Sequence, residues 1–92
     1  MDLVFEWDEG KASANMQKHG VSFEEAQTVF GDPRSITIFD AEHSTDEARF
    51  IDIGHSAEGR LLVVVYTERG ERIRITGSRQ AALTERKQYE QR

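Results

Sequence analysis

The sequence contains no cysteine, which excludes disulfide bonds, thiolate nucleophiles and cysteine-based zinc sites, and fits a reducing compartment. It also lacks an N-terminal basic segment followed by an apolar run, and no stretch approaches the roughly 20 apolar residues that span a bilayer. There is no glycine-rich phosphate loop and no G-x-S-x-G motif, which argues against nucleotide hydrolysis and serine acyl chemistry. We therefore expect a cytoplasmic protein that is neither exported nor embedded in a membrane.

The chain is also short. Its 92 residues lie near the lower end of what folds alone around one hydrophobic core, so we expect a single domain over residues 1–92. Apolar residues make up 37% and charged residues 32%, a composition typical of a folded domain and not of a disordered tail. The core must be thin, and no disulfide compensates for the small size.

Basic charge is scarce but unevenly distributed. The net charge of −5 argues against a nucleic-acid-binding protein, because phosphate contacts need clustered lysine and arginine. Residues 1–46 carry ten acidic against three basic residues, giving −7, whereas residues 47–92 carry seven against nine, giving +2. Nine of the twelve basic residues are arginine, whose planar side chain binds phosphate through two hydrogen bonds. The second half can therefore still hold a local anion site.

The first half of the chain predicts a strand followed by two short helices. Alternating apolar residues indicate a strand at about 3–7. Asp8 is a typical N-terminal helix cap, and the segment 11–18 is rich in helix-forming residues. A capping box begins at Ser22 and predicts a second helix of about nine residues, which ends before Pro33.

The second half predicts a four-strand antiparallel meander and a closing helix. The predicted strands cover 35–39, 50–53, 60–66 and 72–76, and a helix is predicted from Ser78 onward. Five consecutive aliphatic residues from Leu61 to Val65 require burial on both faces of the sheet. The expected fold class is α+β, in the order β-α-α-β-β-β-β-α, with a small antiparallel sheet and helices on one face. The other face is left for a ligand.

Two arginines of the predicted strand 72–76 are candidates for binding RNA. Arg72 and Arg74 alternate with isoleucines, so they project from the same face about 7 Å apart, close to the spacing of successive phosphates. The same pattern is typical of a solvated strand face on which arginines pair with glutamates.

Four further charged residues are candidates for catalysis. Arg60 opens the predicted central strand and Arg79 follows the last one, and functional side chains often project from the ends of elements. Either arginine could equally cap a turn. Glu47 and Arg49 lie two residues apart, on one side of a short strand, and could form an acid–base pair or an ordinary surface ion pair.

The three histidines do not predict a metal site. His19, His43 and His55 are far apart in sequence and lack the H-x-x-x-H spacing and the neighbouring carboxylates that metal binding requires. His19 precedes the glycine that ends the first predicted helix. His43 and His55 lie in predicted loops and could act as proton donors.

Long segments of the chain resemble the BrnT family of toxins. These segments are FEWDEGKASANMQKHGVSFEEAQTVFGDP, HSTDEARFIDIGHS, GRLLVVVYTERG and IRITGSRQAALTERKQYE. The resemblance implies a RelE-like fold, a ribonuclease activity that halts translation, and no cofactor. It also implies a BrnA-type antitoxin, a ribbon-helix-helix DNA-binding protein that neutralises the toxin and links it to operator DNA.

The resemblance further implies which residues act on RNA. Arg60 in GRLLVVVYT and Arg79 in GSR match catalytic arginines of such toxins, and Glu47 and Arg49 match an E-x-R-F segment. Arg72 and Arg74 would guide the RNA backbone. Family members of this kind use no metal: an acid–base residue promotes attack of the ribose 2′-OH on the next phosphate, and arginines stabilise the developing charge. One departure is Gly77, which stands where an apolar residue is expected.

Two functions from different classes fit the sequence. The first is a metal-independent ribonuclease that a partner holds inactive. The second is a non-catalytic module that pairs with a ribbon-helix-helix repressor to regulate its operon, which the low basicity favours. A third interpretation is that the protein is a small scaffold that does not contact RNA.

Overall fold

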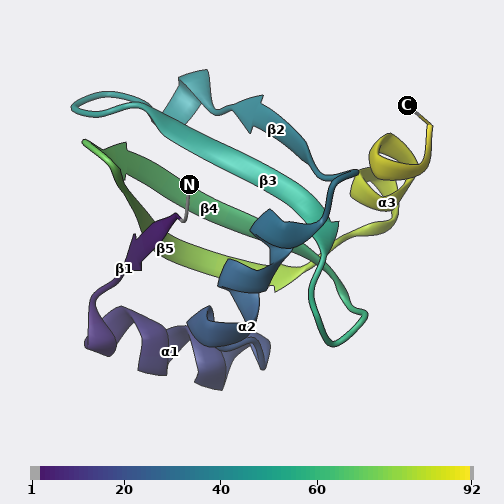
Figure 1. Ribbon diagram of the computed structural model, residues 1–92, viewed down its shortest axis with the longest axis horizontal. Helices are drawn as coiled ribbons and strands as arrows, with labels where there is room; N and C mark the ends of the chain where they lie inside the picture. Colours follow the sequence, from purple (N-terminus) through teal and green to yellow (C-terminus); the bar gives the residue numbers. More distant parts are fainter. Residues whose placement is uncertain (1–2, 92) are drawn as a thin grey trace.

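Five strands form one sheet in the order β1-β5-β4-β3-β2 in the computed structural model, which describes residues 3–91 (Figure 1). The strands are β1 (Val4–Glu6), β2 (Ile36–Phe39), β3 (Arg49–His55), β4 (Leu61–Arg69) and β5 (Arg72–Gln80). The helices are α1 (Glu9–His19), α2 (Phe23–Gln27) and α3 (Leu83–Glu90), with 3-10 turns η1 (Thr28–Gly31) and η2 (Ala41–His43). The α+β class and the order of elements are confirmed. No helix among residues 3–91 is long and apolar enough to cross a membrane.

The sheet is mixed and not purely antiparallel. Strands β2 to β5 form the predicted antiparallel meander. Strand β1 instead pairs in parallel with β5, with Val4 opposite Arg72 and Glu6 opposite Arg74. The prediction of an all-antiparallel sheet is wrong for this strand, because the apolar alternation of a short strand does not encode the direction of its partner.

Strand β5 is longer than the sequence predicts. It continues to Gln80, and the helix expected from Ser78 begins only at Leu83. The backbone of Ser78 faces Val64 of β4 on one side. On its other side the amide of Asn15 in α1 accepts from the Ser78 N–H at 3.1 Å and donates to its carbonyl at 2.8 Å. The buried Asn15 amide thus takes the place of a neighbouring strand beyond the end of β1.

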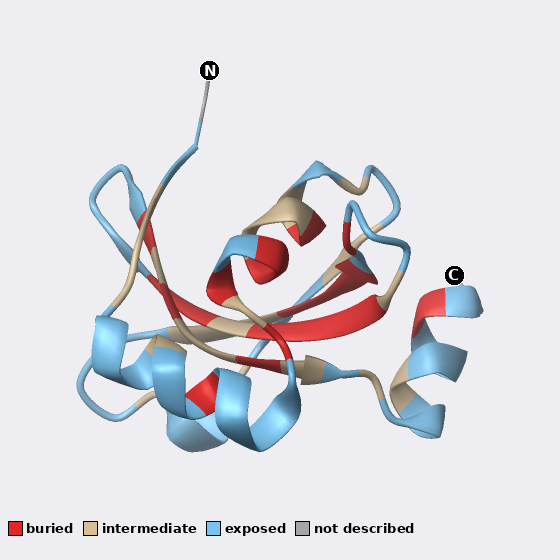
Figure 2. Ribbon diagram, turned by 90° about the horizontal axis from the view of Figure 1, so that it is seen from below, coloured by how far each residue is buried: buried red, intermediate tan, exposed pale blue. Residues whose placement is uncertain are grey.

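One face of the sheet is covered by α2 and η1, and we call it the helix face. Phe23, Ala26 and Val29 pack there against apolar residues of β4 and β5. Phe5 and Trp7 join this cluster, with ring centroids 5.1 Å from Phe30 and 5.9 Å from Phe23, respectively. Figure 2 shows the buried central strands lying beneath α2.

The opposite side of the sheet, which we call the open face, is covered only at one end. There Tyr89 of α3 packs against Ile53, Leu61 and Val63. The prediction that all helices lie on one face is therefore wrong for α3. The aliphatic run in β4 must be buried on both faces of the sheet. Leu61 and Val63 point away from α2, so α3 covers them from the opposite side.

A buried carboxylate lies within the helix face. Asp52 of β3 is 4% exposed and accepts hydrogen bonds from the Thr37 hydroxyl at 2.8 Å and the Tyr66 hydroxyl at 2.9 Å. Burial raises the pKa of Asp52 above its ordinary value of 3.8, and the two hydrogen bonds offset this only in part. Folding therefore shifts the Asp52 carboxyl toward its protonated form, relative to the unfolded chain.

Replacing Asp52 with asparagine is expected to raise the melting temperature at pH 7. A raised folded-state pKa means that stability falls as the pH rises from the unfolded-state pKa through the folded-state value. Asparagine keeps an acceptor oxygen for Thr37 and Tyr66 but carries no charge. Thermal unfolding, monitored by circular dichroism, should show a higher melting temperature for Asp52→Asn than for wild type at pH 7. This difference should disappear near pH 3. An equal change at both pH values would contradict the burial of a charge as its cause.

Candidate active site

A row of polar side chains crosses the open face near one end of the sheet. Arg49 of β3 lies opposite Thr67 of β4, Thr67 lies opposite Arg74 of β5, and Arg74 lies opposite Glu6 of β1. Side chains at facing positions of neighbouring strands share one face and lie close together. Arg49, Thr67 and Arg74 of this row line a pocket of about 210 Å³, which we call the arginine pocket. Its lining residues are Lys11, His43, Thr45, Asp46, Glu47, Arg49, Thr67, Arg69, Arg74 and Thr76.

The arginine pocket joins three of the six residues that the sequence singled out, Glu47, Arg49 and Arg74. It adds Arg69 and Lys11, which sequence reasoning missed. The alternation along β4 could have identified Arg69, because it shares the parity of Thr67. No local pattern identifies Lys11, which α1 brings to β5 from more than sixty residues away in sequence.

The basic side chains of the pocket are not equally neutralised. Arg69 donates to Glu47 at 2.9 Å, and Arg74 donates to Glu6 at 3.1 Å. The bond from Arg74 lowers the pKa of Glu6, so that carboxyl group is charged at neutral pH. Arg49 forms no ion pair with any residue of 3–91. Its positive charge is thus available to an anion.

A buried hydroxyl adds to this site. Thr67 is only 5% exposed, and its Oγ1 is the buried side-chain atom without a hydrogen-bond partner within residues 3–91. Buried polar groups are nearly always paired, so an unpaired one in a pocket lining is typical of a place where a ligand supplies the partner. The Thr67 hydroxyl lies between two arginines in the row and can donate to a bound anion.

Two groups at the pocket are able to move protons. The Nδ1 atom of His43 lies 3.0 Å from the Asp40 carboxylate, which orients the imidazole and leaves Nε2 without a partner among residues 3–91. Glu47 is held by Arg69 on the same lining. A carboxylate-oriented imidazole and a nearby glutamate are the usual components of general acid–base catalysis.

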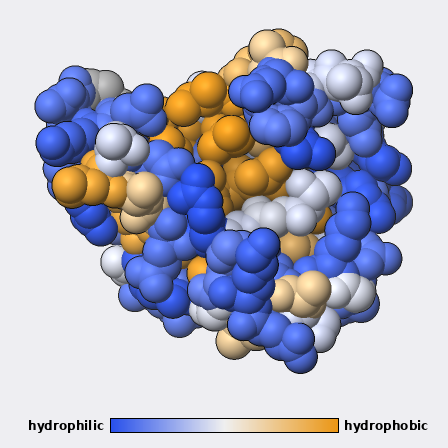
Figure 3. Space-filling model, turned by 180° about the vertical axis from the view of Figure 1, so that it is seen from behind, coloured by the Kyte–Doolittle hydropathy of each residue, from blue (hydrophilic) through white to orange (hydrophobic). Residues whose placement is uncertain are grey.

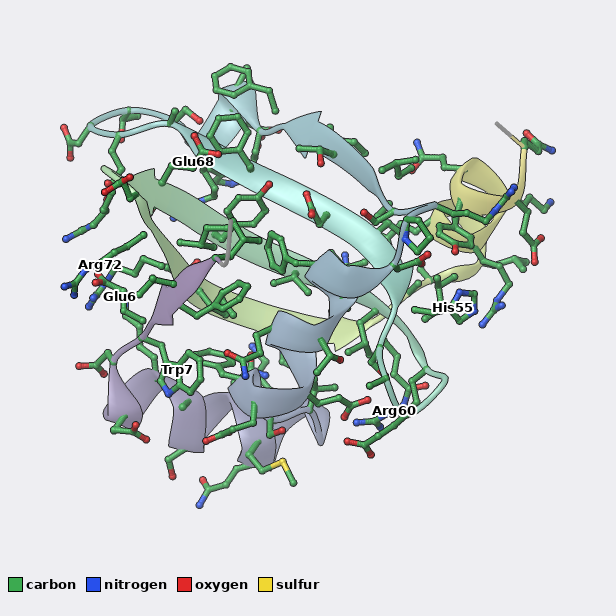
Figure 4. The ribbon with its side chains drawn as sticks, in the orientation of Figure 1. Glu6, Trp7, His55, Arg60, Glu68 and Arg72 are labelled. Atoms are coloured by element: carbon green, nitrogen blue, oxygen red, sulfur yellow. The ribbon has the colours of Figure 1, made fainter. Side chains whose placement is uncertain are left out.

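Arg60 lies away from the pocket, in contact with α2. Its guanidinium donates to Glu25 through Nε at 2.9 Å and through Nη2, and to the carbonyl of Gly20 at 3.1 Å. Glu25 also accepts from Ser56 at 2.8 Å, and the bonds from Arg60 and Ser56 lower its pKa. Figure 4 shows Arg60 and Arg72 at opposite ends of the molecule. Arg60, a catalytic candidate from the sequence, therefore does not share a site with the strand arginines Arg72 and Arg74.

Arg79 shares the open face but lies at its far end. A register shift between Val65 and Tyr66 changes the alternation of β5. It places Arg79 on the same side as Arg74, although the two lie five positions apart and would otherwise point to opposite faces. There it donates two hydrogen bonds of 2.7 Å to Glu85, which also accepts from the Ala82 N–H at 2.7 Å. Arg79 thus fastens the start of α3 to the sheet.

Arg72 lies next to the pocket without lining it. Its side chain is 63% exposed and donates to Glu6 at 3.4 Å, beside the stronger bond from Arg74 (Figure 4). The two arginines share one glutamate, as expected for a solvated strand face.

A second polar cluster joins α3 to the sheet. Asp32 accepts from the Tyr89 hydroxyl at 2.7 Å and from the His55 N–H at 2.8 Å, while His55 Nδ1 lies 3.2 Å from the Tyr89 oxygen. Burial opposes the ionisation of Asp32, but these hydrogen bonds lower its pKa overall. His55, a predicted proton donor, lies here and not in the arginine pocket.

Comparison with known proteins agrees with this architecture. Residues 7–85 match the family described as ribonuclease toxin, BrnT, of type II toxin-antitoxin system. The chain belongs to the BrnT family. It is thus a ribonuclease toxin of a type II toxin–antitoxin system, and such a system implies an antitoxin partner. The resemblance noted in the sequence is confirmed.

A solved BrnT structure shows the same fold. The 1.1 Å crystal structure of the ribonuclease toxin BrnT from Brucella abortus superposes with a TM-score of 0.67, covering 88% of this chain and 99% of that one. The two sequences are 19% identical, so the likeness concerns the fold alone. No curated protein matches this BrnT chain.

Proposed function

We propose that this BrnT chain cleaves RNA in its arginine pocket without a metal ion, and that the cleavage halts translation in the cytoplasm. The observation that carries the proposal is the row of Arg49, Thr67 and Arg74 beside Glu47 and His43. A phosphodiester bound there meets positive charge, hydroxyl donors and two proton-transfer groups together. We further propose that the antitoxin is of the BrnA type, a ribbon-helix-helix protein that alone contacts operator DNA.

The chemistry is a transfer of the phosphoryl group within the RNA. The ribose 2′-oxygen loses its proton and bonds to the adjacent phosphorus, while the bond from phosphorus to the 5′-oxygen breaks and that oxygen gains a proton. The products are a 2′,3′-cyclic phosphate and a 5′-hydroxyl, and no oxidant or co-reactant is consumed. Arg49 and Arg74 stabilise the added negative charge on the phosphoryl oxygens.

The roles of the remaining residues follow from their contacts. Glu47 takes the proton from the 2′-hydroxyl, and His43, oriented by Asp40, gives one to the leaving oxygen. Arg72 and Arg69 contact the flanking RNA backbone. Arg60 and Arg79 differ: each is bound to a carboxylate of a helix, Glu25 and Glu85, and we assign them positioning roles.

The proposal is tested with purified protein and single-stranded RNA in excess EDTA. We expect cleavage that leaves 2′,3′-cyclic phosphate ends, and no cleavage of a fully 2′-deoxy strand. Replacing Glu47 or His43 with glutamine should each lower the rate about 100- to 10,000-fold, the usual contribution of a proton-transfer group. The matched control is His55→Gln, which should cleave at nearly the wild-type rate. Loss of cleavage on chelation would contradict the metal-independent mechanism.

A second candidate is a module that binds its antitoxin without cutting RNA. The ion pairing of Arg69, Arg74 and Arg79 with glutamates favours it, because paired arginines bind phosphate less strongly. It predicts intact RNA in the same assay together with tighter operator binding by the antitoxin when the toxin is added.

A further inference from the structure

An apolar row crosses the open face directly beside the arginine pocket. Ile38 of β2 lies opposite Ile51 of β3, Ile51 opposite Val65 of β4, and Val65 opposite Gly77 of β5. Ile38 is 37% exposed, and Ile51 and Val65 are half-buried. Figure 3 shows an apolar hollow on this side of the molecule. We call the row of Ile38, Ile51, Val65 and Gly77, with Ile36 at its margin, the apolar groove.

Gly77 keeps the β5 end of the groove open. A Cβ atom at this position would meet only the Asn15 side-chain oxygen, at 3.9 Å, so neither packing nor a positive φ requires glycine here. The missing side chain leaves space at the level of Val65. This explains in structural terms why the departure from an apolar residue at Gly77 does not disturb the sheet.

The described helices cover this groove only in part. Tyr89 of α3 packs on Ile53, Leu61 and Val63, and Ile36 and Ile51 are partly buried against that cluster. Ile38 is left exposed. An apolar strip that stays exposed on a small protein is typical of an interaction surface. The side chains of this strip are branched aliphatic ones, whereas RNA bases stack on aromatic rings or arginine planes. The groove thus favours aliphatic side chains of a protein over bases.

The charge beside the groove defines the partner further. Arg49 and Thr67 lie two residues from Ile51 and Val65 along β3 and β4, a distance of about 7 Å. Arg74 lies opposite Thr67, three residues from Gly77, because of the register shift in β5. Arg49 has no carboxylate partner within residues 3–91. Covering this charge with a partner would be unfavourable unless the partner supplied an acid to pair with it.

We propose that the apolar groove is where the antitoxin docks, through a segment that places aliphatic side chains on Ile38, Ile51 and Val65 and an acidic side chain on Arg49. The antitoxin partner follows from the family of the chain. Docking here would also block RNA cleavage, and this part of the proposal rests on the function proposed for the arginine pocket. One bound segment would then fill both the groove and the anion site, and the toxin would be inhibited by direct occlusion.

The test measures binding of the purified antitoxin encoded with this toxin, by isothermal titration calorimetry. Ile38→Glu places a charge on the groove floor at an exposed position and is expected to weaken binding at least about 30-fold, as for a central interface residue. The matched control is Met16→Glu. Met16 lies on α1, outside the groove, and is an apolar residue that is 52% exposed. The Met16→Glu variant should bind the antitoxin with wild-type affinity. If the Ile38→Glu variant does not fold, Ile38→Thr, which keeps a branched side chain, replaces it in the same binding measurement.

The outcomes separate this proposal from the ribonuclease mechanism. The dissociation constant is measured without RNA, so it reports on docking even if no cleavage is found. Unchanged affinity of a folded Ile38→Glu variant would overturn the docking site. Loss of RNA cleavage by that variant with unchanged antitoxin affinity would overturn it too, and would assign the groove to RNA.

Discussion

Replacing Arg49 with alanine is expected to slow RNA cleavage about 100- to 1,000-fold, the typical effect of removing one donor that stabilises transition-state charge. Arg49 is the arginine of the pocket without an ion pair among residues 3–91, so its charge is available to a scissile phosphate. Because it contacts no buried carboxylate, its loss should leave the melting temperature almost unchanged. Single-turnover cleavage of a short RNA in EDTA measures the effect.

The matched control for this prediction is Arg34→Ala. Arg34 is exposed and does not line the pocket. Like Arg49, it forms no ion pair within the described part of the chain. Its replacement removes one positive charge from the surface and should change the rate by less than about twofold, since exposed charges act weakly at physiological salt. Equal losses in the two variants would mean that net charge, and not the pocket, governs cleavage.

Replacing Arg60 with methionine is expected to lower the melting temperature by about 5–10 °C, because the buried Glu25 carboxylate loses its ion-pair partner. The Glu25 side chain is only 4% exposed and would lose both bonds from the guanidinium. Thermal unfolding at pH 7 measures the loss. The double variant with Glu25→Gln should recover much of it, because the charge that needs compensation is then gone.

The pH dependence of the Arg60 variant gives an independent test. The bonds from Arg60 hold the pKa of Glu25 below its ordinary value of 4.5. The pair therefore stabilises the fold fully above that value and less as the pH falls through the lower folded-state pKa. The gap in melting temperature between wild type and Arg60→Met should accordingly narrow in acid.

The same variant also distinguishes a positioning role from a catalytic one. Assayed well below its melting temperature, Arg60→Met should still cleave RNA at close to the wild-type rate, because Arg60 lies outside the arginine pocket. A folded variant that binds antitoxin but does not cleave RNA would instead return Arg60 to the catalytic set.

Local patterns predicted most of the secondary structure because they reflect interactions within a few residues. The Ser22 hydroxyl accepts from the Glu25 N–H at 3.0 Å, as the capping box predicts. The other half of that box is missing, because the Glu25 carboxylate bonds to Arg60 and Ser56. A distant partner thus redirected a side chain whose local role was clear from the sequence.

The sequence by itself determined the order of the elements, the two-sided burial of Leu61–Val65 and the family, since these depend on short-range periodicity and on long matching segments. The tertiary structure alone decided which charged residues meet. The parallel pairing of β1, the contact of Asn15 with Ser78 and the register shift at Val65 are long-range pairings that no local pattern encodes. Because side-chain direction in a sheet alternates with every residue, a shift of one position moved Arg79 to the open face, while Arg60 was drawn to Glu25 on the other side.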